Sequence, residues 1–228
     1  MKFTTLLSII LTSFLLSQVS SVSADDSYQL LPVDEGVRDQ EFVNFRSELL
    51  AVVLAREPEV FVTMMDQQIL NGLHEPRGMK QFLKKWEPDS IDSELWATLE
   101  HILTMGGGFV RSEKGVEFCA PYVFSHFPDN LDIFAYGAVI GGDVALKAEP
   151  SASSATQKYL SYDLLTVLDW VSTQDESGSG ESWLKVTTLK GDKGYVDRQL
   201  VRSPSDYSVC FLKTDNRGWK INSLLTRE

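Results

Sequence analysis

The sequence predicts an α+β fold, in which a helical N-terminal region with an antiparallel β-sheet is joined to a small closed β-barrel. Apolar residues first recur at helical spacing, up to three consecutive glycines, Gly106 to Gly108, that end the last helix. The pattern then changes to short strands separated by turn residues. Five closely spaced strands between residues 144 and 201 favour a barrel, because closure removes unpaired strand edges.

Residues 1–24 have the pattern of a secretory signal peptide. Lys2 supplies a positive start, Leu6 to Leu16 is mostly apolar, and Val22-Ser23-Ala24 offers small residues for cleavage. The apolar run is short for a membrane span, which needs about 20 residues. We therefore expect an exported protein, periplasmic or secreted, with no transmembrane segment after cleavage. An uncleaved N-terminal anchor is the alternative.

The N-terminal domain is expected to cover residues 25–140 and to begin with a loose, polar leader. Pro58 can occupy the first position of a helix, and Asp92 or Ser93 can cap another. The predicted helices cover about 38–57, 58–66, 78–86 and 93–105, with a short strand at Ile69-Leu70.

Strands are expected after the glycines. Residues 109–110 and 116–124 flank Glu113-Lys114-Gly115, which is typical of a hairpin. Pro121 interrupts the second run, so that strand should lie at a sheet edge or carry a bulge. A further strand is predicted at 135–140.

The C-terminal segment 203–228 reads as a β-hairpin, with a turn at Asp215 to Gly218. It is too apolar to remain free, so we expect it to pack back on the N-terminal domain. The barrel, residues 141–202, would then be an insertion. Within it, Asp175 to Ser182 is a low-complexity tract expected to form a long hairpin loop.

Three short motifs in the barrel segment resemble the bacterial SH3 family. They are Leu146 to Ser151, Trp183 to Val186, and Gly194 to Val196 followed by Leu200. Gly194 would let the backbone pass close to a neighbouring strand. The chain differs from the family in having Tyr195 where tryptophan is usual, and in a longer acidic loop before Trp183. The resemblance implies binding of cell-wall peptides or envelope proteins rather than catalysis.

The same resemblance implies a groove formed by aromatic side chains. Trp170 and Tyr162 lie near turns and are expected to be exposed, whereas Trp183 and Tyr195 could instead fill the barrel core. The candidate ligand-binding residues are Tyr159, Tyr162, Trp170, Trp183 and Tyr195.

The order of motifs along the whole chain also resembles a group of exported SH3 domain-containing bacterial proteins without an assigned activity. The motifs are a spaced glycine, phenylalanine and tryptophan (Gly78, Phe82, Trp86), the run Ala120 to Val123, and Arg202 to Pro204. This likeness concerns architecture and adds nothing about function.

Charge and cysteine content limit the function classes. The formal net charge of −11 argues against nucleic acid and anionic lipid surfaces as partners. Cys119 and Cys210 both lie in apolar, strand-like runs. They could pair in an oxidising compartment or remain as small buried apolar residues, and the sequence leaves both possibilities open.

No catalytic motif, cofactor site or metal site is predicted, and we expect a non-enzymatic binding protein. The histidines follow no metal-ligand spacing, and Gly106 to Gly108 lacks the lysine of a phosphate-binding loop. One alternative is a cone-shaped N-terminal domain, weakly similar to ketosteroid isomerase-like folds, with a ligand-binding or catalytic pocket reaching Trp86 or Trp96. Its candidate acids and bases are Asp66, His74, His101 and His126. A second alternative is an inhibitor or immunity-type protein with an acidic recognition surface.

Overall fold

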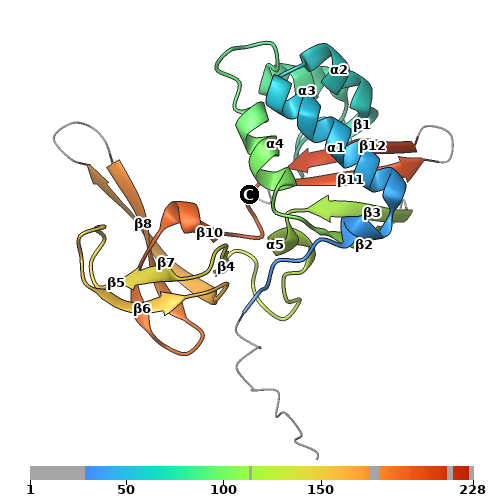
Figure 1. Cartoon of the computed structure of the whole chain (residues 1–228). Helices are drawn as coiled ribbons and strands as arrows, with labels where there is room; N and C mark the ends of the chain where they lie inside the picture. The colour runs from blue at the N-terminus through green and yellow to red at the C-terminus, as the bar shows by residue number, and fades with distance from the viewer. Residues whose placement is uncertain (1–28, 113–114, 175–179, 215–217, 226–228) are drawn as a thin grey trace, which may run out of the picture.

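The computed structural model describes residues 29–112, 115–174, 180–214 and 218–225 of the chain. The signal peptide predicted at residues 1–24 therefore lies outside the described residues. Most of the loop predicted at Asp175 to Ser182 does so too. The predicted α+β class is confirmed, because five α-helices accompany two mainly antiparallel sheets in the described part of the chain. Figure 1 shows α1 to α4 gathered over one sheet, with α5 apart from them and the second sheet to one side. No helix among the described residues has the length and apolar character needed to cross a membrane.

Local signals place the helices. Asp39 caps α1 by accepting hydrogen bonds from the backbone N–H groups of Glu41 and Phe42, and Pro58 occupies the first turn of α2. The α-helices are α1 (Gln40–Ala55), α2 (Pro58–Met64), α3 (Met79–Trp86), α4 (Leu95–Leu103) and α5 (Tyr122–Ser125); two short 3-10 helices are η2 (Glu35–Arg38) and η3 (Arg198–Leu200).

The structure has two sheets, and the strands of the first sheet come partly from before and partly from after the second sheet in the sequence. Its order is β1 (Met65–Leu70), β12 (Gly218–Leu225), β11 (Ser208–Thr214), β3 (Gly115–Ala120) and β2 (Gly108–Ser112). β1 runs parallel to β12, and the other pairs are antiparallel. The C-terminal strands β11 and β12 thus lie between β1 and β3.

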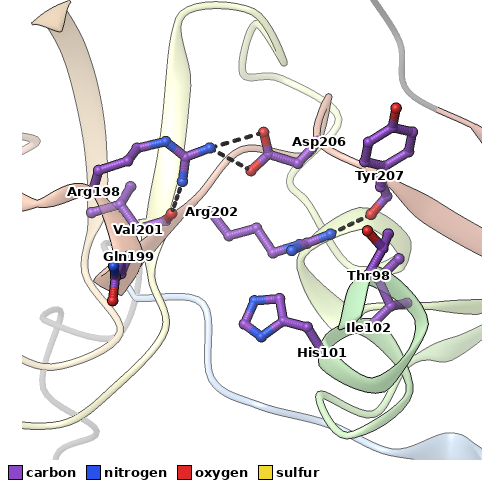
Figure 2. A pocket seen from close by; sticks show the side chains of 9 residues that line it. All are labelled: Thr98, His101, Ile102, Arg198, Gln199, Val201, Arg202, Asp206 and Tyr207. Atoms are coloured by element: carbon purple, nitrogen blue, oxygen red, sulfur yellow. Dashed lines mark hydrogen bonds and ion pairs between the residues drawn. The ribbon is translucent and has the colours of Figure 1, made fainter. Parts of the chain in front are cut away.

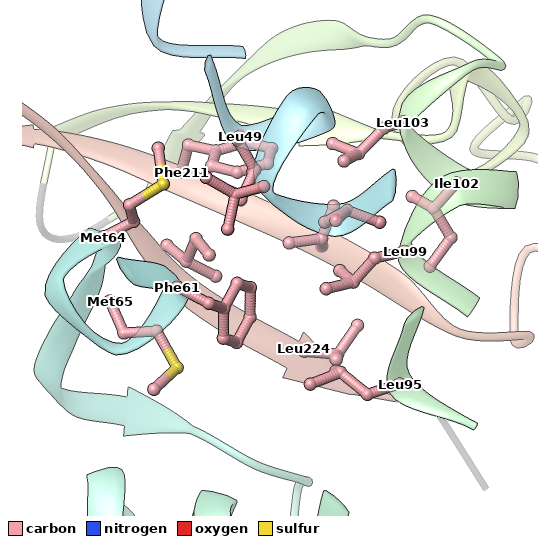
Figure 3. Packing of buried hydrophobic residues seen from close by; sticks show 14 of the residues in the cluster. Leu49, Phe61, Met64, Met65, Leu95, Leu99, Ile102, Leu103, Phe211 and Leu224 are labelled. Atoms are coloured by element: carbon pink, nitrogen blue, oxygen red, sulfur yellow. The ribbon is translucent and has the colours of Figure 1, made fainter. Parts of the chain in front are cut away.

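Helices α1 to α4 and the first sheet together form the first domain, and the core of this domain lies between them. Figure 3 shows side chains from α1, α2 and α4 meeting Phe211 of β11 and Leu224 of β12. Phe42 of α1 is fully buried, and its ring centroid lies 4.2 Å from that of Phe118 and 4.9 Å from that of Trp219. The amphipathic stripes recognised in the sequence are therefore the faces that bury this core.

Two expectations for this domain were wrong. The strand predicted at 116–124 ends at Ala120 and lies inside the sheet, because Pro121 comes just after the last ladder residue and its missing N–H costs no sheet hydrogen bond. The leader is not loose from residue 29 onward. Leu30 is buried, and both carboxylate oxygens of Asp34 accept hydrogen bonds from Arg46 at 2.7 Å.

The second sheet has seven strands, and every pair in it is antiparallel. Its order is β10 (Val201–Arg202), β4 (Tyr136–Val139), β7 (Leu164–Gln174), β8 (Gly180–Thr188), β9 (Lys193–Asp197), β5 (Val144–Lys147) and β6 (Thr156–Leu160). A buried cluster of aliphatic residues, including Leu146, Leu184 and Val186, fills one face. A Cβ added at Gly194 would lie 2.6 Å from the Lys147 carbonyl oxygen, so the two backbones approach closely there, as predicted.

The closed barrel predicted for this region was wrong, because the seven-stranded sheet is open. β10 pairs with β4, a strand that precedes the predicted barrel, instead of closing onto the first strand of the segment. β10 and β6 remain as the two edges. Between the sheets, Leu30, Tyr122, Val123, Ala138 and Leu164 form a small buried cluster that joins the leader, α5, β4 and β7.

The two cysteines are bonded to each other. Cys119 of β3 and Cys210 of β11 are directly opposite one another in the ladder, with Cα atoms 4.1 Å apart. The disulfide therefore joins the last strand before the second sheet to the first strand after it.

Candidate functional site

An open crevice lies between helix α4 of the first domain and the η3–β10 segment of the second sheet (Figure 2). Its volume is about 600 Å³, within the range of about 300–1,000 Å³ that is common for small-ligand sites. The residues that line it are Thr98, His101, Ile102, Arg198, Gln199, Val201, Arg202, Asp206 and Tyr207.

Regular structure positions each wall. Thr98, His101 and Ile102 share one face of α4, because they are three and four residues apart. On the other wall, the Asp197 carboxylate caps η3 by accepting a hydrogen bond from the Gln199 N–H at 2.9 Å. Arg202 follows on β10, which is held by its pairing with β4.

Arg198 is held in place by several contacts. Its guanidinium donates to the Val201 carbonyl at 2.8 Å and forms an ion pair with Asp206 at 3.3 Å. It also lies 4.7 Å from the centre of the Trp170 ring, a cation–π geometry. Trp170 is 61% exposed, so an aromatic surface continues from this arginine toward solvent.

Arg202 is the unusual residue of the crevice. It is only 7% exposed, its Nη2 donates to the Tyr207 carbonyl, and its Nε has no hydrogen-bond partner among the described residues. Burial lowers the pKa of Arg202, and the nearby Asp206 opposes this effect. An arginine nonetheless stays protonated at neutral pH, so a positive charge is held in a poorly solvated position.

His101 faces these charges from α4. His101 is partly exposed, and its partial desolvation lowers its pKa below the ordinary value of 6.5. Arg202 lowers this pKa further, Asp206 acts in the opposite direction, and Arg198 again lowers it. The imidazole is therefore neutral at neutral pH and can accept or donate a hydrogen bond. The arrangement as a whole presents donors and positive charge, which suits an anionic, acceptor-rich ligand.

We expect mild acid to destabilise the fold through His101. Its pKa is lower in the folded chain than in the unfolded chain, so the unfolded state binds the proton more readily and stability falls as pH drops below about 6.5. The free energy of unfolding, measured with urea at about pH 7.5 and about pH 5, should fall less between these two pH values in His101→Gln than in the parent. Carboxylates with lowered pKa values, such as Asp34 and Asp39, change the free energy of unfolding mainly below about pH 4. They therefore contribute little to the difference between about pH 7.5 and about pH 5. Equal losses in both proteins would contradict this assignment.

The predicted aromatic residues do not form one groove. Trp183 is only 5% exposed and is therefore part of the core, which was its alternative role. Tyr162, which was expected to be exposed, is half-buried at the junction with the leader, where its carbonyl accepts a hydrogen bond from the Leu30 N–H. Tyr195 opposes Lys147 and Tyr159 opposes Ala145, which places both tyrosines on one face of β9, β5 and β6. Trp170 lies on β7, separated from that group by β8.

The candidate acids and bases are similarly scattered. His101 lines the crevice, whereas the His126 Nδ1 lies 3.0 Å from the Ser125 hydroxyl, and Asp66 accepts a hydrogen bond from the Gln68 N–H. His74 is exposed on a loop. In the part of the chain that the structure describes, the group that could offer three metal ligands contains Glu117 and both cysteines, and the disulfide removes the thiolates.

The hollow that reaches Trp86 lies at the surface. It has a volume of about 310 Å³ and is lined also by charged residues such as Lys85 and Glu87. Trp96 lies deeper, is 2% exposed, and its indole N–H donates to the Pro88 carbonyl. The deep cone-type pocket expected in the alternative hypothesis is not present among the described residues near these tryptophans.

Sequence reasoning missed both crevice arginines and considered His101 only as a possible catalytic group. The available signal was weak. Arg198 and Arg202 are two positive charges close together in an acidic chain, directly after the Gly194 motif. His101, which lines the same crevice, is far away in the sequence, so only the fold brings the three residues together.

Comparisons of the chain with protein-family models, with curated proteins and with solved structures find no match.

Proposed function

We propose that this protein is an exported, non-enzymatic binding protein whose seven-stranded sheet is an SH3-like module that binds peptide chains of the cell envelope, in peptidoglycan or in an envelope protein. The observation that carries the proposal is Trp170. This large aromatic residue is 61% exposed, is held against Arg198, and lies beside the crevice. Exposed aromatic side chains backed by arginine are typical anchors of binding surfaces.

The placement of the three family-like motifs supports an SH3-like module. Leu146 lies on β5, Trp183 on β8 and Gly194 on β9, and these strands are neighbours in the sheet. Gly194 makes the close backbone approach that the motif requires. The proposed module differs from a closed SH3-like barrel, because its sheet is open and β10 pairs with β4.

The disulfide supports export. Disulfides persist in oxidising compartments such as the bacterial periplasm and the extracellular space, and are rare in the cytosol. The pattern at residues 1–24 points to the same location.

A pull-down with purified sacculi tests the proposal. The Trp170→Ala variant should be recovered about tenfold less than the parent, because truncation of an aromatic anchor typically costs more than 1 kcal/mol. Tyr159→Ala is a matched control, since Tyr159 is as exposed as Trp170 but lies across the sheet on β6.

Three results are informative. Loss of recovery in Trp170→Ala alone supports the proposal. Loss in Tyr159→Ala alone would move the binding surface to β6 and β9. If the parent protein does not bind sacculi or extracted envelope proteins at all, the proposed function is wrong.

A further inference from the structure

We propose that the crevice between α4 and β10 binds the free carboxylate group of a peptide, with Arg202 and Arg198 holding its charge. This inference rests on the proposed function, because it names the chemical group that a peptide-binding protein would recognise here. The carboxylate would lie between the β10 wall and the α4 wall seen in Figure 2.

The buried side chain of Arg202 lacks a complete set of partners. This side chain is more than nine-tenths buried, forms no ion pair with a described residue, and keeps its Nε without a partner. Asp206, the nearest carboxylate in the crevice, is occupied by Arg198 and by the Ser203 N–H at 2.9 Å. A buried charge without a partner is costly. A ligand that supplies a negative charge would offset that cost.

The charges of the crevice favour a carboxylate over a phosphate. Arg198 and Arg202 contribute two positive charges, and Asp206 removes one. His101 is neutral at neutral pH because of its lowered pKa. The remaining single positive charge matches one carboxylate, whereas a phosphate dianion would leave an excess negative charge beside Asp206. The planar guanidinium also matches the two oxygens of a carboxylate.

The other walls suit the end of a peptide. Ile102 and Val201 offer an apolar surface for a small terminal side chain, and Thr98 and Gln199 offer polar groups for the preceding amide. The volume of about 600 Å³ accommodates the last residues of a chain rather than an isolated ion. Toward solvent, Arg198 leads to Trp170, where earlier residues of the peptide could stack.

The test compares N-acetyl-alanyl-alanine with its C-terminal amide, using the full mature protein and calorimetry or NMR titration. The acid should bind at least about thirtyfold more tightly than the amide, because the amide carries no negative charge and leaves the buried arginine unpaired. Inorganic phosphate, as a separate arm, should neither bind as tightly as the acid nor displace it. This comparison needs no variant, so it does not depend on any mutant folding.

Variants then assign the site. Arg202→Met retains an unbranched apolar stem and removes the buried charge, so it should stay folded and bind the acid about thirtyfold more weakly. Arg111→Met, at an exposed position on β2, is the matched control and should bind like the parent. Preserved thermal unfolding of Arg202→Met would show that the loss concerns binding.

Several outcomes would overturn the inference: equal affinity for acid and amide, tighter binding of phosphate, unchanged affinity in Arg202→Met, or no binding of either peptide at millimolar concentration. The two proposals can fail separately. Recovery on sacculi that depends on Trp170, without discrimination between acid and amide, rejects the carboxylate site alone. Selective binding of the acid without recovery on sacculi or envelope proteins rejects the proposed function alone.

Discussion

Deletion of residues 203–228 will leave the first domain unable to fold. This deletion removes β11 and β12, which lie between β1 and β3 in the five-stranded sheet. It takes the fully buried Phe211 and Leu224 out of the core and leaves β1 without its only partner in the described sheet. A chain covering residues 25–202 should therefore be poorly soluble and show no cooperative thermal unfolding of its helices, measured by far-UV and near-UV circular dichroism.

An excision provides the control for this deletion. Ala120 of β3 and Val209 of β11 are directly paired, so a short glycine-rich turn can replace residues 121–207 and convert the two strands into a hairpin. This protein retains β11, β12 and both cysteines, and its helices should still unfold cooperatively, although with lower stability. Cooperative unfolding and native near-UV spectra in the 25–202 chain would show that the C-terminal strands are not part of the domain's essential core.

The elements predicted correctly from the sequence depend on local chemistry. Pro58 begins α2 and the glycines from Gly106 end the helical region, because these residues restrict or free the backbone at their own positions. The C-terminal hairpin and the close approach at Gly194 also leave a local signature. Each of these features can be recognised within a few residues.

The features that were missed depend on contacts between distant residues. The pairing of β10 with β4 opens the sheet, and nothing in the spacing of the 144–201 strands indicates that partner. The packing of Leu30 near Tyr162 similarly depends on segments more than a hundred residues apart. The crevice needs α4 and η3 to face each other, so neither Arg202 nor His101 stands out in the sequence as part of a shared site.

The cysteines show the same distinction. Their apolar, strand-like surroundings were correctly recognised, yet pairing required β3 and β11 to be neighbours with Cys119 opposite Cys210. The two strands come from before and after the second sheet in the sequence, so the local sequence around either cysteine does not indicate this register. The disulfide is thus a consequence of the topology, and its contribution to stability can be calculated from the length of chain that it closes.

Loss of the disulfide should lower the free energy of unfolding by about 4–5 kcal/mol. The two cysteines are 91 residues apart, and chain-entropy theory assigns this amount to a loop of that length. Cys119→Ala/Cys210→Ala is the preferred variant, because both side chains are buried and alanine adds no unsatisfied polar group. Urea unfolding of the oxidised parent, the double variant and the parent with a phosphine reductant measures the difference.

The position of the disulfide predicts which part of the protein it stabilises, in addition to the total change in the free energy of unfolding. Cys119 and Cys210 hold together the two strands from which the second sheet emerges, so the bond limits how far β3 and β11 can separate when that sheet unfolds. In the oxidised protein the first domain should therefore survive unfolding of the second sheet, whereas in the double variant the two transitions should move together toward lower urea. Tryptophan fluorescence and near-UV circular dichroism follow the two transitions. Superimposable curves for oxidised and reduced protein would contradict this account, because they would mean that the β3–β11 ladder and its core hold the insertion without the covalent bond.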